Sequence, residues 1–323
     1  MAHSPKNHNP IPIFIGGTGR SGTTILGDML NEHSLIRTSN PTEIKFLANR
    51  GGLLDVIFGS PTSKISDREG ISILHYRTYR NRKKKSAQMR RDNIQIFREN
   101  LWQKWWQIDA KPPHGPGLHT GITKDVLTQL LNKFEKSINR TPVRAGSRFM
   151  KDFIANQSDS TDTDKYWVET TPMNISYARH LLALFPHAKF IVMRRDPRDV
   201  IASLVTKDWG PSTPLEGVEW IENRLRAGHL GQSFIPKAQL LTIDLEDLVT
   251  NSPGQTYNKI LTFLEIEDEP AMRAFHEEKM SSDLASSGRW KNQIDSPEFS
   301  QAITEMAQRL KADGIECGRL AFS

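Results

Sequence analysis

The feature that most constrains the fold is a glycine-rich turn between an apolar run and a helical pattern. The run is Ile11-Pro-Ile-Phe-Ile15, the turn is Gly16-Gly-Thr-Gly-Arg-Ser-Gly-Thr-Thr24, and apolar residues then recur at i, i+4 as far as Leu30. Glycines let successive backbone N–H groups point inward, and the following helix adds its unpaired N–H groups and positive dipole end. The segment therefore predicts an α/β fold whose first loop binds a phosphate or sulfate group.

Two later segments repeat the pattern of a short apolar run followed by a polar turn and a helix. The runs are Lys189-Phe-Ile-Val-Met193 and Gln239-Leu-Leu-Thr-Ile243. After the first of them, Asp196 is placed to cap a helix that begins at Pro197. This repetition predicts a parallel sheet flanked by helices, the phosphate-loop fold seen in nucleotide kinases.

The 323 residues suit a single domain, 1–323, carrying one insertion. Residues 60–150 are basic and rich in helix formers, so we expect them to form a largely helical insertion or lid. Trp102, Trp105 and Trp106 within it are expected to pack rather than to bind a ligand. A basic run from Arg77 to Lys85, followed by Arg90 and Arg91, is typical of a solvated helix face.

Composition narrows the class of protein further. Lys and Arg outnumber Asp and Glu by 43 to 37, for a net charge of +6, which suits an anionic ligand without implying nucleic acid. The single cysteine, Cys317, excludes an internal disulfide and offers no cluster for a metal. The chain lacks a signal peptide pattern and a run of about 20 apolar residues, so we expect a cytoplasmic protein without a membrane span.

The loop departs from the nucleotide-triphosphatase template G-x-x-x-x-G-K-[ST] at one position. Gly17, Gly22 and Thr24 fit the template, but Thr23 stands in place of the lysine. Arg20 supplies a cation three residues earlier and can neutralise a phosphosulfate group without a metal ion. The substitution argues against an ATP or GTP hydrolase.

At this loop the chain resembles the sulfotransferases that use 3′-phosphoadenosine 5′-phosphosulfate (PAPS), whose loop commonly reads R-S-G-T-T. The resemblance implies that the donor's 5′-phosphosulfate is held by Thr18, Gly19, Arg20, Ser21, Gly22, Thr23 and Thr24. It also implies that 3′-phosphoadenosine 5′-phosphate (PAP) is the product and that no metal is needed. A second matching segment places Arg195 after a strand and Ser203 eight residues later, the pattern that binds the 3′-phosphate in this family.

A third and weaker resemblance lies in Ser286-Ser-Gly-Arg-Trp-Lys291, which is similar to a segment that closes over the nucleotide. It implies that Trp290 packs against adenine and that Arg289 and Lys291 add charge. Trp167-Val-Glu-Thr-Thr-Pro-Met-Asn174 is similar to a further family stretch, but Thr170 replaces a lysine often found there. Asp244-Leu-Glu-Asp-Leu248 is similar to another, largely structural, stretch.

Sulfuryl transfer also needs a base for the acceptor proton. In branches of the family that use a glutamate, this residue follows the first helix, and Glu43 in Thr-Glu-Ile-Lys-Phe46 is the matching position. We expect Glu43 to act as base while Arg20 stabilises the bridging oxygen. His33 and Asp152 are the rival bases.

Two other functions stay open on the sequence alone. One is a kinase of a nucleotide or small molecule, with Asp244 as a Mg²⁺ ligand. The other is a protein that binds an adenosine nucleotide without turnover. For the sulfotransferase, we expect the acceptor hydroxyl to belong to a carbohydrate, a glycolipid or a natural product.

Overall fold

The computed structural model describes residues 9–59, 76–107, 116–280, 288–318 and 320, with the side chains of 76–87 left out. The chain forms two compact units, and each is described by itself. Unit 1 comprises Met1–Asn9, Ser39–Thr163 and His180–Pro186, and unit 2 comprises Pro10–Thr38, Asp164–Arg179 and His187–Ser323.

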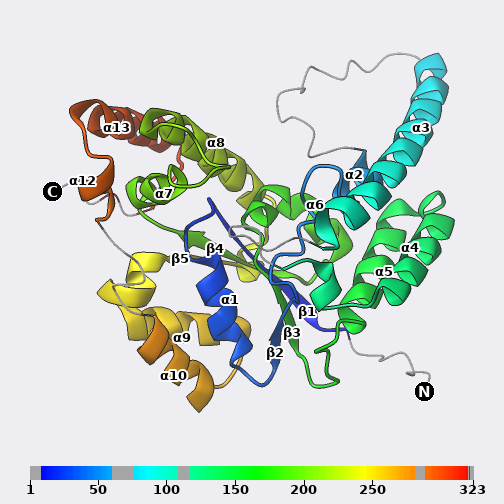
Figure 1. Cartoon of the computed structure of the whole chain (residues 1–323), viewed down its shortest axis with the longest axis horizontal. Helices are drawn as coiled ribbons and strands as arrows, with labels where there is room; N and C mark the ends of the chain where they lie inside the picture. Colours follow the sequence, from blue (N-terminus) through cyan, green and yellow to red (C-terminus); the bar gives the residue numbers. More distant parts are fainter. Residues whose placement is uncertain (1–8, 60–75, 108–115, 281–287, 319, 321–323) are drawn as a thin grey trace. The chain divides into compact units, whose positions relative to one another are not determined.

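Unit 2 is built on a five-stranded parallel sheet in the order β2-β3-β1-β4-β5 (Figure 1). The strands are β1 (Ile11–Gly17), β2 (Ile36–Thr38), β3 (Tyr166–Glu169), β4 (Lys189–Arg194) and β5 (Leu240–Asp244). β1 is central, with Gly17 opposite Met193 of β4 and Phe14 opposite Glu169 of β3. Because all five strands run the same way, the loops after β1, β4 and β5 meet at one edge of the sheet, where open α/β folds bind ligands.

Helices cover both faces of this sheet, as its continuous apolar strands require. One face packs against α1 (Thr23–Asn31), α9 (Pro253–Leu264) and α10 (Pro270–Lys279) through a core that includes Ile13, Ile191 and Ile243. The other face carries η3 (Pro172–Tyr177) and α8 (Pro214–Gln232). A second apolar cluster joins α8 to α7 (Pro197–Leu204), α12 (Trp290–Gln293) and α13 (Pro297–Ala312). The short elements η4 (Lys237–Gln239) and η5 (Asp247–Asn251) flank β5.

The fold class predicted from the sequence is confirmed. All three predicted strands are present, and the Asp196 carboxylate caps α7 by accepting a hydrogen bond of 2.9 Å from the Arg198 N–H. β2 and β3 were not predicted, because with three and four residues they are too short to show a period.

Unit 1 is helical in the part that the structure describes. It contains α2 (Leu53–Phe58), α3 (Tyr76–Asn100), η1 (Leu101–Trp105), η2 (Leu118–Thr120), α4 (Lys124–Ile138), α5 (Pro142–Ala155) and most of α6 (Ala178–Leu184). Its core is aromatic: Phe46 packs edge-on against Phe153 at 5.1 Å between ring centroids, and Phe134 lies 5.2 Å from Phe149. Trp105 is buried beside Phe97, as expected of a packing residue.

The described residues of the predicted insertion, 76–107 and 116–150, belong to unit 1, together with 39–59 and 151–163. Residues 60–75 and 108–115, and the side chains of most of the basic run, lie outside the described residues. No helix in the described part of the chain is long and apolar enough to cross a membrane.

Candidate functional site

The loop after β1 is wound by residues in the left-handed conformation. Gly19, Arg20 and Gly22 have φ values of 80°, 56° and 92°. Gly17 is required for a different reason, because a Cβ atom there would lie 2.5 Å from both the Met193 carbonyl oxygen and the Ser21 Oγ. The backbone therefore turns tightly against β4, as a loop that encloses an anion must.

The helix that follows the loop leaves its positive end available. No side chain described in the structure caps the N-terminus of α1, and its first turn carries no acidic residue. The Ser21 Oγ is buried and has no hydrogen-bond partner among the described residues. Thr23 is buried at the first position of α1, while Thr24 is exposed. Such a helix end with a hydroxyl beside it favours an anionic ligand.

Arg20 joins the loop to the segment after β4. Its Nε donates a hydrogen bond of 3.0 Å to the Oγ of Ser203, which is 183 residues away in the chain. The Nη1 of Arg195 donates to the Arg20 carbonyl oxygen at 2.9 Å. The structure thus brings the first two predicted motifs into direct contact.

The third motif is held against α7 by one carboxylate. Asp199 accepts hydrogen bonds from the backbone N–H groups of Gly288, at 2.9 Å, and Trp290, at 3.2 Å. The Arg198 guanidinium lies 4.3 Å from the centroid of the Trp290 ring, whose residue is 9% exposed. Trp290 therefore anchors this segment, and Arg289 and Lys291 are the residues in it that can offer charge. Ser286 and Ser287 lie outside the described residues.

Three arginines gather at this edge of the sheet. Burial lowers the pKa of Arg195, and the neighbouring cations Arg289 and Arg20 lower it further, while Asp199 and Glu246 oppose the change. Like charges brought this close repel one another, so a bound dianion would stabilise the cluster. The arrangement fits a ligand with phosphate or sulfate groups.

A partly buried carboxylate, that of Glu246, borders the three arginines. Glu246 follows β5, and its Oε1 accepts a hydrogen bond of 2.9 Å from the Asp196 N–H. Its other oxygen, Oε2, is buried without a hydrogen-bond partner among the described residues. Burial raises the pKa of Glu246, and the charges of Asp196 and Asp244 raise it further.

Asp244, the candidate Mg²⁺ ligand of a kinase, is engaged elsewhere. Arg194 binds it with both arms of the guanidinium, Nε to Oδ1 at 2.9 Å and Nη2 to Oδ2 at 2.7 Å. Among the described residues no group of three or more His, Cys, Asp or Glu side chains is placed to hold a metal ion. The bidentate pair disfavours the kinase.

The three candidate bases have different surroundings. His33 is buried in unit 2, where its Nδ1 accepts from the Leu35 N–H at 3.1 Å and its Nε2 lies 3.0 Å from the Glu267 carbonyl oxygen. Asp152, on α5 of unit 1, accepts from the Lys133 Nζ at 2.6 Å. The side chains of His33 and Asp152 are thus both engaged in hydrogen bonds or ion pairs within their own unit.

Glu43 is a partly buried residue of unit 1. Its segment is held by Gln157, whose Nε2 donates to the Ser39 Oγ at 3.1 Å and to the Asn40 carbonyl oxygen at 2.9 Å. The Thr120 hydroxyl adds a bond of 2.8 Å to the Asn40 Oδ1. Glu43 follows the last residue of β2 by five positions.

The stretch from Trp167 to Asn174 forms its own buried network. The Glu169 carboxylate is fully buried and accepts from the Thr171 hydroxyl and the Asn174 side-chain amide. Thr170 is also fully buried, and its Cγ2 lies 2.6 Å from where a Cβ on Gly27 would stand. This position therefore packs α1 onto β3 and supplies no cation.

A model of the sulfotransferase family matches residues 12–270, which is most of the chain. The chain belongs to the sulfotransferase family. The match spans the loop, Arg195 and Ser203, and ends before the segment around Trp290.

Two solved structures to which the chain is similar are sulfotransferases, and the likeness to the first concerns the fold alone. The sulfotransferase domain from the Synechococcus PCC 7002 olefin synthase is 17% identical, with a TM-score of 0.52 over 96% of this chain and 98% of that one. Sulfotransferase STF1 from Mycobacterium tuberculosis H37Rv is 14% identical, with a TM-score of 0.49 over 94% of this chain and 77% of that one. No curated protein sequence matches the chain.

Sequence reasoning missed two acidic residues that shape the site of this sulfotransferase. Asp199 holds the segment at 288–290, and Glu246 braces Asp196. Asp199 lies between Arg195 and Ser203 in the sequence, but its partners are backbone N–H groups 89 and 91 residues away. No spacing in the sequence marks such a contact.

Proposed function

We propose that this sulfotransferase transfers the sulfuryl group of PAPS to an acceptor hydroxyl, with PAP as the second product. The observation that carries the proposal is the bond between Arg20 and Ser203, which couples a 5′-phosphosulfate loop to a 3′-phosphate motif. A loop for one anion would suit many nucleotides. Two linked anion sites suit a nucleotide with phosphate groups at both ends.

The residues divide between the two ends of this donor. Arg20, the Ser21 hydroxyl, Thr24 and the backbone N–H groups from Thr18 to Thr24 would hold the phosphosulfate at the start of α1. Arg195, Ser203, Arg289 and Lys291 would hold the 3′-phosphate. Partial burial of Arg195 next to Arg20 and Arg289 favours an anionic ligand at this end of the donor.

The chemistry needs one base and one cation. The acceptor oxygen bonds to sulfur as the bond from sulfur to the phosphate oxygen breaks, and PAP leaves with the electron pair. Glu43 takes the acceptor proton, and Arg20 stabilises the charge that grows on the leaving oxygen. We propose a carbohydrate, a glycolipid or a natural product as the acceptor.

The donor is tested by titration calorimetry with PAP and by transfer from labelled PAPS, each with and without EDTA. We expect PAP to bind, and label to reach an acceptor, equally well in EDTA. ATP binding that requires Mg²⁺, with no affinity for PAP, would instead support the kinase. PAP binding without transfer to any acceptor class would support a nucleotide-binding protein.

Glu43→Gln tests the base. We expect turnover to fall by about 100-fold or more, because a positioned base contributes roughly 10²–10⁴ in rate. PAP affinity should stay within twofold of wild type. Glu99→Gln, an exposed change in the same unit, is the matched control. Turnover of Glu43→Gln within a few-fold of wild type would rule out this role.

A further inference from the structure

A cavity lies next to the start of the loop, on the face of the sheet that α8 covers. Its volume is about 290 Å³, and it lies wholly within unit 2. One wall is formed by Gly17, Thr18 and Val192, the opposite wall by Arg224 and Gly228 of α8, and the C-terminal tail 314–317 completes it. Its wall is therefore continuous with the first residues of the donor loop.

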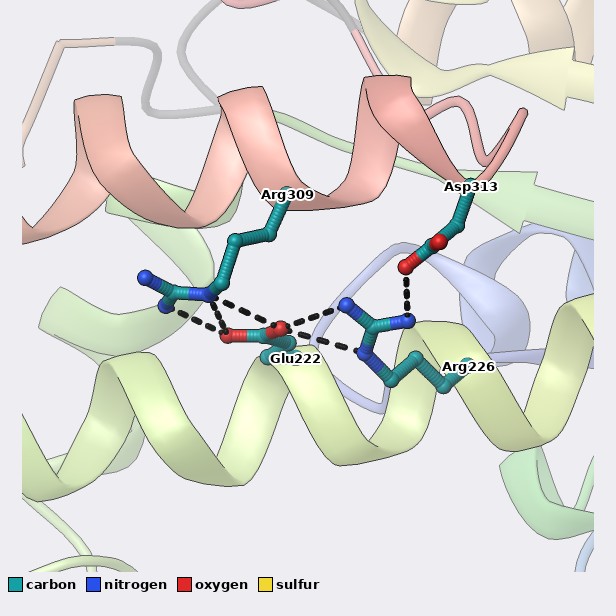
Figure 2. Close-up of polar contacts among 4 residues, drawn as sticks. All are labelled: Glu222, Arg226, Arg309 and Asp313. Carbon is teal, nitrogen blue, oxygen red and sulfur yellow. Dashed lines mark hydrogen bonds and ion pairs between the residues drawn. The ribbon is translucent and has the colours of Figure 1, made fainter.

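The tail is fixed to α8 by a network of four charged side chains (Figure 2). Glu222 of α8 binds Arg226 at 2.8 Å and Arg309 of α13 at 2.7 Å. Arg226 in turn binds Asp313 at 2.6 Å. Because Asp313 directly precedes the tail, the network holds residues 314–317 where they line the cavity.

The cavity is lined by three arginines, Arg194, Arg195 and Arg224, and their charges are unequally neutralised. Arg195 also belongs to the donor site, where its Nη1 donates to the Arg20 carbonyl oxygen. Arg194 is neutralised by Asp244 and by Glu316. Arg224 differs, because within the described part of the chain its guanidinium has no hydrogen bond and no ion pair. Its guanidinium carbon lies 4.6 Å from the centroid of the Trp220 ring. Burial lowers the pKa of Arg224, and the electrostatic interaction with Tyr177 partly offsets this decrease.

A guanidinium stays protonated in proteins, so Arg224 keeps its charge in this partly buried position. Burying a charge without a partner is costly, and the planar fork of donors matches a carboxylate, sulfate or phosphate. The remaining walls include Ile175, Ile221 and Leu225, which favour an apolar group beside the anion. A volume near the lower end of ligand pockets, about 300 Å³, admits a group as large as one aromatic ring.

We propose that this cavity is a second anion site, which binds a carboxylate, sulfate or phosphate group carried on an apolar part of the acceptor, with Arg224 as its main contact. The inference rests on the proposed function, since it names the class of acceptor. The acceptor would be anchored by its own negative charge beside the loop, with a hydroxyl elsewhere on the molecule left to react.

Calorimetry with benzoate, on protein saturated with PAP, tests the site directly. We expect wild type to bind benzoate at least tenfold more tightly than the neutral benzamide. Arg224→Gln should lose that preference while its PAP affinity stays within twofold. Lys237→Gln, which removes an exposed cation from the same unit, should behave as wild type. Arg224→Gln should also melt close to wild type, because among the described residues the lost charge has no ion pair and only the Trp220 ring packs against it.

The outcomes separate the two proposals. Equal benzoate affinity in wild type and Arg224→Gln, or no benzoate binding at all, would overturn the second anion site and leave PAPS as donor. Displacement of benzoate by PAP would also overturn it, because the cavity would then be part of the nucleotide site. If the protein binds benzoate but has no affinity for PAP, PAPS is ruled out as the donor, while the proposal of a second anion site stands.

Discussion

At the scale of the residue, Arg20 connects the loop to the rest of the site. It adopts a left-handed conformation that costs a non-glycine residue roughly 1–2 kcal/mol. In that conformation its side chain reaches Ser203 and its carbonyl oxygen accepts from Arg195. Strained residues of this kind cluster where a ligand is bound, because surrounding contacts hold them in place.

Ser203→Ala is therefore expected to weaken PAP binding by about tenfold, the effect of losing one hydrogen bond to a charged group. Titration calorimetry measures this loss. Ser233→Ala, which removes an exposed hydroxyl bonded to the Leu230 carbonyl oxygen, should leave the affinity unchanged. An unchanged affinity in Ser203→Ala would remove this residue from the 3′-phosphate site.

At the scale of the element, two helices position parts of the site that they do not themselves form. α7 carries Asp199, which binds the backbone at Gly288 and Trp290. α8 carries Glu222, which holds α13 and so the tail along the cavity (Figure 2). In both cases an acidic side chain near a helix surface orders a segment from the end of the chain.

The contact between α8 and α13 predicts a pH dependence of stability. Arg309 lowers the pKa of Glu222 in the folded protein, and Arg226 lowers it further, below the ordinary value of 4.5. The stabilisation is therefore complete above about pH 4.5 and is lost as the pH falls through the folded pKa. Because Arg226 and Arg309 are partly exposed, their ion pairs with Glu222 contribute little. We therefore expect Glu222→Gln to lower the melting temperature by only about 1–3 °C at pH 7.

This difference from wild type should shrink as the pH falls below about 4.5, which a series of melting curves against pH would measure. Glu219→Gln, an exposed change on the same helix, is the control. A difference that is constant from pH 7 to pH 4 would show that the ion pairs do not stabilise the fold.

At the scale of the whole molecule, the donor-site residues described here share unit 2. They come from three regions of the chain, around positions 20, 200 and 290, and the parallel sheet brings the first two to one edge. Glu43 belongs to unit 1. Donor binding should therefore stabilise the folded chain whether or not the base is intact.

Saturating PAP, at 100 times its dissociation constant, should add about 2.7 kcal/mol to the stability of wild type and of Glu43→Gln alike. Thermal melting in EDTA measures the effect. Arg195→Gln at the same PAP concentration should show a smaller shift, because a partly buried cation of the site is gone. A shift seen with ATP and Mg²⁺ but not with PAP would contradict the donor assignment.

Much of the fold could be predicted because its elements have strong local signals. β1, β4 and β5 are apolar runs, and α7 begins with a capping aspartate followed by proline. β2 and β3 lack such signals, since they are short and become strands only by pairing with neighbours. Thr170 stands where the family often has a lysine. Its packing role likewise becomes clear only from its contact with Gly27.

The family and the conformation of the loop follow from local sequence, because glycines, hydroxyl groups and an arginine in a short run act through local backbone geometry. Which distant groups meet depends on folding: Arg20 with Ser203, Asp199 with Gly288 and Trp290, and Arg224 with a cavity. The physical reason is that a charge is neutralised or left without a partner by what folding brings beside it, and spacing along the chain does not contain that information.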